Sequence, residues 1–197
     1  TIDQATKAME IFYYELFAKQ LDLSGFKRPK KARTLPTFLS PNEVDQIISH
    51  TKNFRNRLMI ELAYSAGLRV SELVKIKVEH LKLDRLMLHV PELERNKRTT
   101  FFSKYLKDSL GRQIGAKNIG QYLFPSERGG ALTTRAVAKF FKKSLIASGI
   151  KKLATPHSLR QSFINFRFNQ GTDLDAIKNT LGQKITFSTF SDSKKAA

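Results

Sequence analysis

Two short stretches of the sequence place an arginine where a helix is expected to begin, and an arginine there can bind phosphate. The first stretch is AGLRVSEL (residues 66–73), in which Arg69 follows a glycine that breaks one helix and precedes the next helix. An arginine at a helix start opposes the helix dipole, so a bound phosphate would explain its position. Its guanidinium can donate two parallel hydrogen bonds to phosphate. The alternative is a surface arginine paired with Glu72, three residues further on.

The second stretch is TPHSLRQ (residues 155–161), which places a histidine and an arginine on one helical face. Pro156 favours a helix start, and His157 and Arg160 follow at a spacing of three residues. The arginine can neutralise the non-bridging oxygens of a phosphodiester, and the histidine can donate a hydrogen bond or move a proton. This pair therefore suits phosphoryl transfer, although an isolated His/Arg pair is also common on protein surfaces.

The charge balance favours nucleic acid as the partner. The 197 residues contain 35 Lys and Arg against 17 Asp and Glu, a net charge of +18, which a polyanion would offset. We expect no membrane partner, because no apolar run approaches about 18 residues. The chain has no Cys and four scattered His, so we expect no disulfide, metal centre or cofactor, and a reducing, cytoplasmic location.

The elements that must position these residues follow from the apolar spacing. An amphipathic helix is predicted over residues 2–20, and residues 25–36 (GFKRPKKARTLP) have the composition of a linker or of a basic strap across a DNA backbone. Ser40, Pro41 and Glu43 form a helix-start signal. Residues 84–101 predict a β-hairpin with its tip near residues 92–96. Further helices are predicted over 54–65, 70–76, 103–114, 131–148, 157–169 and 173–181.

Taken in order, the motifs resemble the catalytic domain of the tyrosine recombinases, the Xer-type and phage-type integrases in particular. AGLRVSEL, the hairpin, HSLRQSF and GTDLDAIKNTLG match the family pattern between about residues 35 and 190. The resemblance implies an α+β, predominantly helical fold with a small antiparallel sheet. It also implies that residues 1–24 end a truncated core-binding domain, that 25–36 are a basic linker, and that 37–197 are the catalytic domain.

The resemblance also implies a reaction and the residues that perform it. Tyrosine recombinases cut and rejoin duplex DNA through a phosphotyrosyl intermediate, without metal or cofactor, and they assemble as tetramers on DNA. Two arginines bind the scissile phosphate, and by motif these are Arg69 and Arg160, with His157 as their companion. A lysine at the hairpin tip protonates the leaving oxygen. We also expect DNA contacts from the basic side chains of the linker and the tip: Lys27, Arg28, Lys30, Lys31, Arg33, Arg95, Lys97 and Arg98.

The sequence departs from the family pattern at the catalytic positions. Leu93 falls where the lysine is expected, and Lys97 or Arg95 could replace it. Gln161 and Gln183 stand where histidine is common; a glutamine keeps its hydrogen bonds but cannot shuttle a proton near neutral pH. No Tyr follows Tyr122, and the nucleophile position falls near Phe190, in a final segment shorter than the family's by a residue or more.

These departures leave three hypotheses for the function. The first is a recombinase catalytic domain that grips duplex DNA but cannot cleave it by the family route, because phenylalanine has no oxygen to attack phosphorus. The second is a non-catalytic DNA-binding relative on the same fold. The third is a generic basic RNA-binding protein, which the sequence supports weakly because most Phe residues lie at core spacing.

Overall fold

The computed structural model describes residues 2–21, 23, 37–91 and 98–181. The chain divides into two compact units, residues 1–34 and 35–197. In the first unit, helix α1 (Ile2–Phe17) carries exposed apolar side chains that include Met9, Phe12 and Leu16. Its assignment to a core-binding domain stays a prediction.

The second unit begins with a helix whose start the sequence predicted. Helix α2 (Pro41–Ser49) has Ser40 as its N-cap, and the Ser40 hydroxyl accepts a hydrogen bond from the Glu43 backbone N–H. The Glu43 carboxylate accepts one in return from the Ser40 N–H at 2.7 Å. This capping box satisfies two backbone donors that the helix itself leaves without partners.

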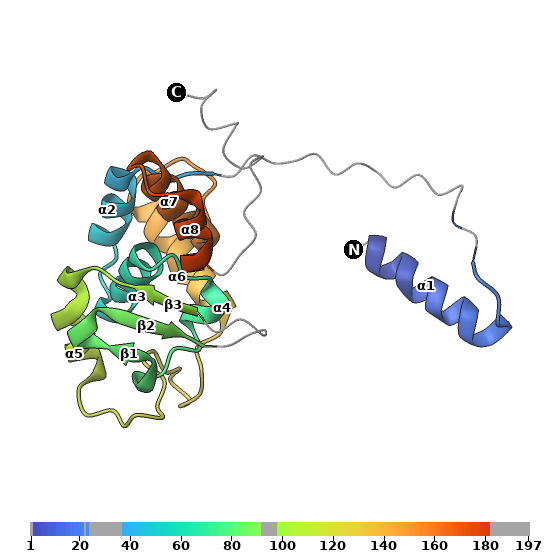
Figure 1. Cartoon of the computed structure of the whole chain (residues 1–197), viewed down its shortest axis with the longest axis horizontal. Helices are drawn as coiled ribbons and strands as arrows, with labels where there is room; N and C mark the ends of the chain where they lie inside the picture. The colour runs from blue at the N-terminus through green and yellow to red at the C-terminus, as the bar shows by residue number, and fades with distance from the viewer. Residues whose placement is uncertain (1, 22, 24–36, 92–97, 182–197) are drawn as a thin grey trace. The chain divides into compact units, whose positions relative to one another are not determined.

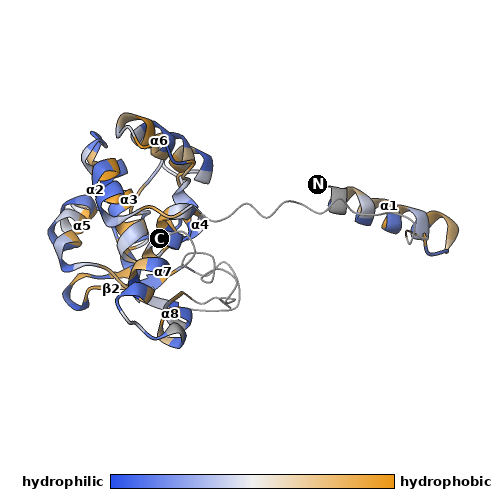
Figure 2. Cartoon of the chain, turned by 90° about the horizontal axis from the view of Figure 1, so that it is seen from above, coloured by the Kyte–Doolittle hydropathy of each residue, from blue (hydrophilic) through white to orange (hydrophobic). Residues whose placement is uncertain are grey.

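Helix α3 (Phe54–Ser65) lies at the centre of the second unit and contacts α2, α6 and α7. Leu58, Met59 and Leu62 on this helix are fully buried, as expected of a helix packed on several sides. The core is mainly aliphatic. Of the described Phe residues only Phe102, Phe124 and Phe141 are buried, fewer than the sequence suggested. In Figure 2, hydrophobic and hydrophilic residues alternate along the helices, which is typical of helices that bury one face.

The predicted hairpin is present as part of a three-stranded antiparallel sheet. Strands β1 (Leu81–Lys82), β2 (Met87–Val90) and β3 (Arg98–Phe101) lie in that order, as Figure 1 shows. In the β2–β3 pair, Val90 faces Arg98 and Leu88 faces Thr100. All four of these residues are buried, so one side of the hairpin faces the core. The hairpin tip lies outside the described residues.

Helix α4 (Val70–Leu73) precedes the sheet and is shorter than the predicted 70–76. Short 3₁₀ turns occupy Val78–His80, Leu83–Arg85 and Lys104–Leu106. The remaining helices are α5 (Lys107–Ile114), α6 (Thr134–Ala147), α7 (Pro156–Asn169) and α8 (Leu174–Leu181).

Helix α8 contacts both α7 and strand β3. A small apolar cluster of Ile164, Ile177 and Leu181, with Phe163 and Phe168 packed against it, joins α7 to α8. This cluster holds the end of α8 near the turn between α3 and α4, because the Leu181 side chain also lies against Gly67. No helix in the described part of the chain is long and apolar enough to cross a membrane.

Candidate functional site

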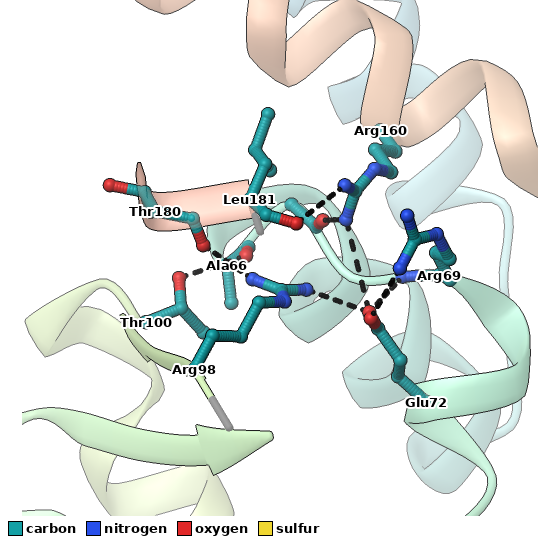
Figure 3. Close-up of polar contacts among 9 residues, drawn as sticks. Ala66, Arg69, Glu72, Arg98, Thr100, Arg160, Thr180 and Leu181 are labelled. Atoms are coloured by element: carbon teal, nitrogen blue, oxygen red, sulfur yellow. Dashed lines mark hydrogen bonds and ion pairs between the residues drawn. The ribbon is translucent and has the colours of Figure 1, made fainter. Parts of the chain in front are cut away.

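Three arginines converge on one buried carboxylate. Glu72 on α4 is 3% exposed, and its carboxylate pairs with Arg69, Arg98 and Arg160. Figure 3 shows the three guanidinium groups around this carboxylate, each coming from a different segment of the chain. These four residues, here called the Glu72 cluster, combine three positive charges with one negative charge. The positive charges outnumber the negative charge at short range, which favours the binding of an anion.

Arg69 is the N-cap of α4 and is bound to Glu72 twice. Its backbone N–H donates to Glu72 Oε2 at 2.7 Å, and its Nη1 donates to Oε1 at 3.1 Å. Because α4 has only four residues, its dipole opposes Arg69 only weakly, and the Glu72 carboxylate offsets that opposition. The pairing with Glu72 that we held as the alternative is therefore present. Even so, 39% of the Arg69 side chain is exposed, which leaves surface for a ligand.

A glycine turn between α3 and α4 lies beside the Glu72 cluster. Gly67 has φ +60° and ends α3, a conformation that glycine adopts without the Cβ penalty. A Cβ at this position would lie 2.7 Å from Phe163 Cδ1 on α7 and 2.9 Å from Leu181 Cδ2 on α8. The turn thus allows two helices to approach closely, and it directs the Gly67 carbonyl toward Arg160.

Arg160 on α7 is the most deeply buried member of the cluster, at 1% exposed. Its Nη1 donates to the Gly67 carbonyl at 2.6 Å and lies 3.8 Å from Glu72 Oε2, while its Nη2 donates to the Leu181 carbonyl at 3.0 Å. Burial, and then the nearby charge of Arg98, lower the pKa of Arg160 to about 10. Arg160 therefore still carries its charge near neutral pH.

His157 lies one helical turn before Arg160, at the exposed start of α7. Loss of hydration lowers the pKa of His157, and the charges of Arg160 and Arg69 lower it further. The ring is therefore mostly neutral near pH 7. His157 Nε2 lies 3.1 Å from Gln161 Nε2, so the Gln161 amide orients the ring. The structure thus brings together Arg69, His157 and Arg160, which the sequence singled out.

Arg98 and Glu72 are the parts of the site whose role the sequence reasoning missed. We expected Arg98 to contact DNA, but the structure places it at 9% exposed, with Nη2 donating to Glu72 Oε2 at 2.7 Å and Nη1 to the Thr180 carbonyl at 2.6 Å. A signal was present in the hairpin. Since Val90 faces Arg98 across the strands, an inward-facing Val90 requires an inward-facing Arg98. DNA contact by Arg98 stays a prediction.

The other expected site residues lie outside the described part of the chain. They are the linker cations Lys27, Arg28, Lys30, Lys31 and Arg33, the hairpin-tip residues Leu93, Arg95 and Lys97, and the C-terminal Gln183 and Phe190. Their roles stay predictions. Within residues 2–21, 23, 37–91 and 98–181, no group of acidic or histidine side chains is arranged to hold a metal ion.

One hollow among the described residues lies away from the Glu72 cluster. It has a volume of about 680 Å³ and is lined mainly by apolar residues, including Phe101, Tyr105 and Phe166. None of the three cluster arginines lines it. Charge and hydrogen bonding, rather than a cavity, identify the Glu72 cluster as the candidate site.

Comparison with known proteins gives one family. The model of the phage integrase family matches residues 37–189. The chain is 31% identical over 200 residues to a protein named tyrosine recombinase XerD from Oceanobacillus iheyensis, covering 92% of this chain and 67% of that protein. It is 31% identical over 175 residues to one named tyrosine recombinase XerC from Anoxybacillus flavithermus, covering 82% of this chain and 58% of that protein.

The fold is also found among solved structures. A lambda integrase tetramer bound to a Holliday junction superposes with a TM-score of 0.72 at 21% identity, covering 93% of this chain and 57% of that one. At this identity the likeness establishes the fold alone. It agrees with the predominantly helical architecture and small antiparallel sheet described above, and it confirms the fold class predicted from the sequence.

Proposed function

The chain belongs to the phage integrase family, and we propose that it binds duplex DNA as the catalytic domain of a tyrosine recombinase, with a phosphodiester held between Arg69 and Arg160. The observation that carries this proposal is the convergence of three arginines on Glu72, with His157 beside them. The cluster has positive charge left over after Glu72 is paired. A phosphodiester has the single negative charge and the flat pair of oxygens that guanidinium groups recognise.

We propose a distinct role for each of these residues toward the phosphate. Arg160 is protonated and held by two backbone carbonyls, so it supplies a fixed charge that does not reorganise on binding. Arg69 presents the exposed part of its guanidinium to the ligand. His157, mostly neutral near pH 7, can donate a hydrogen bond to one phosphate oxygen from its N–H or accept a proton at its other ring nitrogen.

The most direct test is Arg69→Ala, because Arg69 is partly exposed and its loss does not open the core. We expect the variant to bind a duplex more weakly by about 1–3 kcal/mol, the contribution of a hydrogen bond to a charged group. Lys107→Ala removes an exposed cation on α5 and serves as the control. Equal losses in the two variants would mean that Arg69 contributes only general charge, and would count against the proposal.

We further propose that these 197 residues grip DNA without cutting it. Cleavage by the family route needs a phenol oxygen that attacks phosphorus while the bond to the 5′ oxygen breaks and that oxygen takes up a proton. The chain has no Tyr after Tyr122, and Phe190 cannot supply the oxygen. Incubation with a nicked duplex that traps covalent intermediates should give no adduct on a denaturing gel. A protein–DNA adduct would refute the claim.

We also propose that copies of the chain come together on DNA, as the lambda integrase tetramer on its Holliday junction suggests. The chain spans 67% and 58% of the lengths of the two relatives named above. In sedimentation experiments we expect a monomer when the protein is free of DNA and a larger species when it is bound to duplex DNA. A protein that stays monomeric on a saturating duplex would show that these 197 residues do not assemble by themselves.

A further inference from the structure

The C-terminal end of α8 is held by two arginines of the Glu72 cluster. Arg98 donates to the carbonyl of Thr180 and Arg160 donates to the carbonyl of Leu181. These are the last two residues of α8, and the final carbonyls of a helix have no partner within the helix and carry its negative partial charge. The end of α8 is therefore attached to the site through charge-assisted hydrogen bonds.

Arg98 makes this attachment and also holds Glu72. One terminal nitrogen binds Thr180 O and the other binds Glu72 Oε2, at 2.6 and 2.7 Å. Its backbone belongs to β3, the strand that follows the hairpin tip. A single guanidinium therefore connects the hairpin, α4 and α8. Lysine could not make both bonds in this way, because its ammonium is one point of charge and not a planar fork.

The Arg98 side chain is 6% exposed, and its two terminal nitrogens are bound to Glu72 and Thr180. Its Nε is enclosed and has no hydrogen-bond partner among the described residues. Leaving a buried donor without a partner has a free-energy cost, and the two short bonds at the other end of the guanidinium offset it. Arg98 is thus oriented toward Glu72 and α8.

We propose that Arg98 is a positioning residue of the phosphate-binding site, holding Glu72 and the end of α8 so that Arg160 and Arg69 keep the geometry that binds phosphate. This inference rests on the proposed function. Arg98 competes with Arg160 for the same oxygen, Glu72 Oε2, at 2.7 Å against 3.8 Å. Without Arg98, Arg160 would move closer to Glu72 and would be less able to serve a ligand. Thr180 O would also lose its donor, and α8 would fray.

A purely structural role is the competing explanation, since a buried ion pair can hold a fold together without serving a ligand. The two roles differ in one measurable respect. A structural arginine changes stability alone, whereas a positioning arginine also changes the affinity of Arg69 and Arg160 for phosphate in the molecules that remain folded.

The test uses inorganic phosphate as the probe and the ¹H–¹⁵N signals of the arginine side chains as the readout. In the unmodified chain we expect the Arg69 and Arg160 signals to shift saturably with phosphate. In Arg98→Met we expect the affinity to fall about tenfold, the equivalent of one charge-assisted hydrogen bond. Hydrogen exchange in the last turn of α8 should become faster. Arg98→Lys should give an intermediate affinity, because it keeps the charge beside Glu72 but loses the second bond.

Arg55→Met is the matched control. Arg55 is partly buried and, like Arg98, donates to a backbone carbonyl (that of Pro125, at 3.1 Å) and has an enclosed Nε without a partner among the described residues. It lies at the opposite end of α3 from Gly67. We expect it to lower stability and to leave phosphate affinity unchanged. If Arg98→Met does not fold, Arg98→Lys is compared with Arg55→Lys instead.

The inference is overturned if the Arg98 variants bind phosphate as tightly as the unmodified chain, or if Arg55→Met weakens phosphate binding as much as Arg98→Met. Failure of the proposed function would look different. In that case the Arg69 and Arg160 signals of the unmodified chain would not respond to phosphate at all, and both proposals would fall together.

Discussion

At the scale of single residues, the site depends on how one carboxylate is shared. Glu72 is three residues after Arg69, so the turn of α4 returns its carboxylate to the Arg69 backbone N–H. Arg98 and Arg160 reach the same carboxylate from segments 26 and 88 residues away in sequence, the separations of residues 98 and 160 from residue 72. Three guanidinium groups would repel one another without it. The carboxylate therefore makes it possible to bury Arg98 and Arg160 close to one another.

His157 allows a prediction about pH. Burial by its surroundings and the charges of Arg160 and Arg69 lower its pKa below the ordinary value of 6.5. A phosphate beside the ring favours the protonated form, so binding should take up a proton. Affinity for duplex DNA should therefore rise as the pH falls from the pKa of the complex toward the lower pKa of the free chain. His157→Gln should flatten this dependence, as measured by fluorescence anisotropy at fixed ionic strength.

The same pKa has the opposite effect on stability. Because the folded pKa of His157 is depressed, the unfolded chain binds a proton more readily between that value and 6.5. This residue thus makes the free energy of unfolding decrease as the pH falls through that window, and the loss is complete below the folded pKa. His157→Gln should therefore weaken the pH dependence of the free energy of unfolding. His50→Gln, at the exposed end of α2, is the control. If both variants change this dependence equally, His157 is not its cause.

At the scale of elements, the turn between α3 and α4 determines whether α7 and α8 can approach the site. Gly67 provides both the left-handed backbone and the space that Phe163 and Leu181 occupy. The two helices that pack against Gly67 carry Arg160 and the Leu181 carbonyl. One residue without a side chain is therefore as important to the site as the charged residues around it.

Gly67→Ala tests this arrangement. The substitution combines the cost of a left-handed alanine, about 1–2 kcal/mol, with an overpacked contact of about 1–3 kcal/mol. Gly149→Ala is the matched control, because Gly149 has φ +74° but no atom within 4 Å of an added Cβ. Urea unfolding should show the larger loss of stability at Gly67. Equal losses at the two positions would mean that the close contact of α7 and α8 with Gly67 does not contribute to the free energy of unfolding.

At the scale of the whole molecule, the dominant property is a net charge of +18 on 197 residues. Such a charge attracts any polyanion, and we propose that the Glu72 cluster distinguishes one phosphate from the rest. Affinity for duplex DNA should fall steeply with salt, with a log–log slope that corresponds to roughly 6–10 phosphate contacts. Anisotropy titrations at several salt concentrations measure the slope. A flat response, or tighter binding to a structured RNA of equal length, would favour the RNA-binding hypothesis.

Much of the architecture could be predicted because it depends on local chemistry. The α2 start follows from Ser40, Pro41 and Glu43, whose capping bonds form within four residues. The limits of α3 follow from its apolar run and from Gly67. Family resemblance was predicted from the order of AGLRVSEL, the hairpin and HSLRQSF, and the match over residues 37–189 confirms it. Arg69, His157 and Arg160 could be singled out because each lies in such a local motif.

The tertiary structure alone decided how those residues are used. Whether Arg98 faces DNA or the core depends on the register of β2 and β3 and on where α8 ends, and the end of α8 is set by packing between segments 82 residues apart in sequence. The partners of Arg160, Gly67 O and Leu181 O, come from two other elements. A sequence determines which side chains can bind phosphate, because that is a property of the residue. The burial, pairing and pKa of those side chains depend on neighbours that only the folded chain brings together.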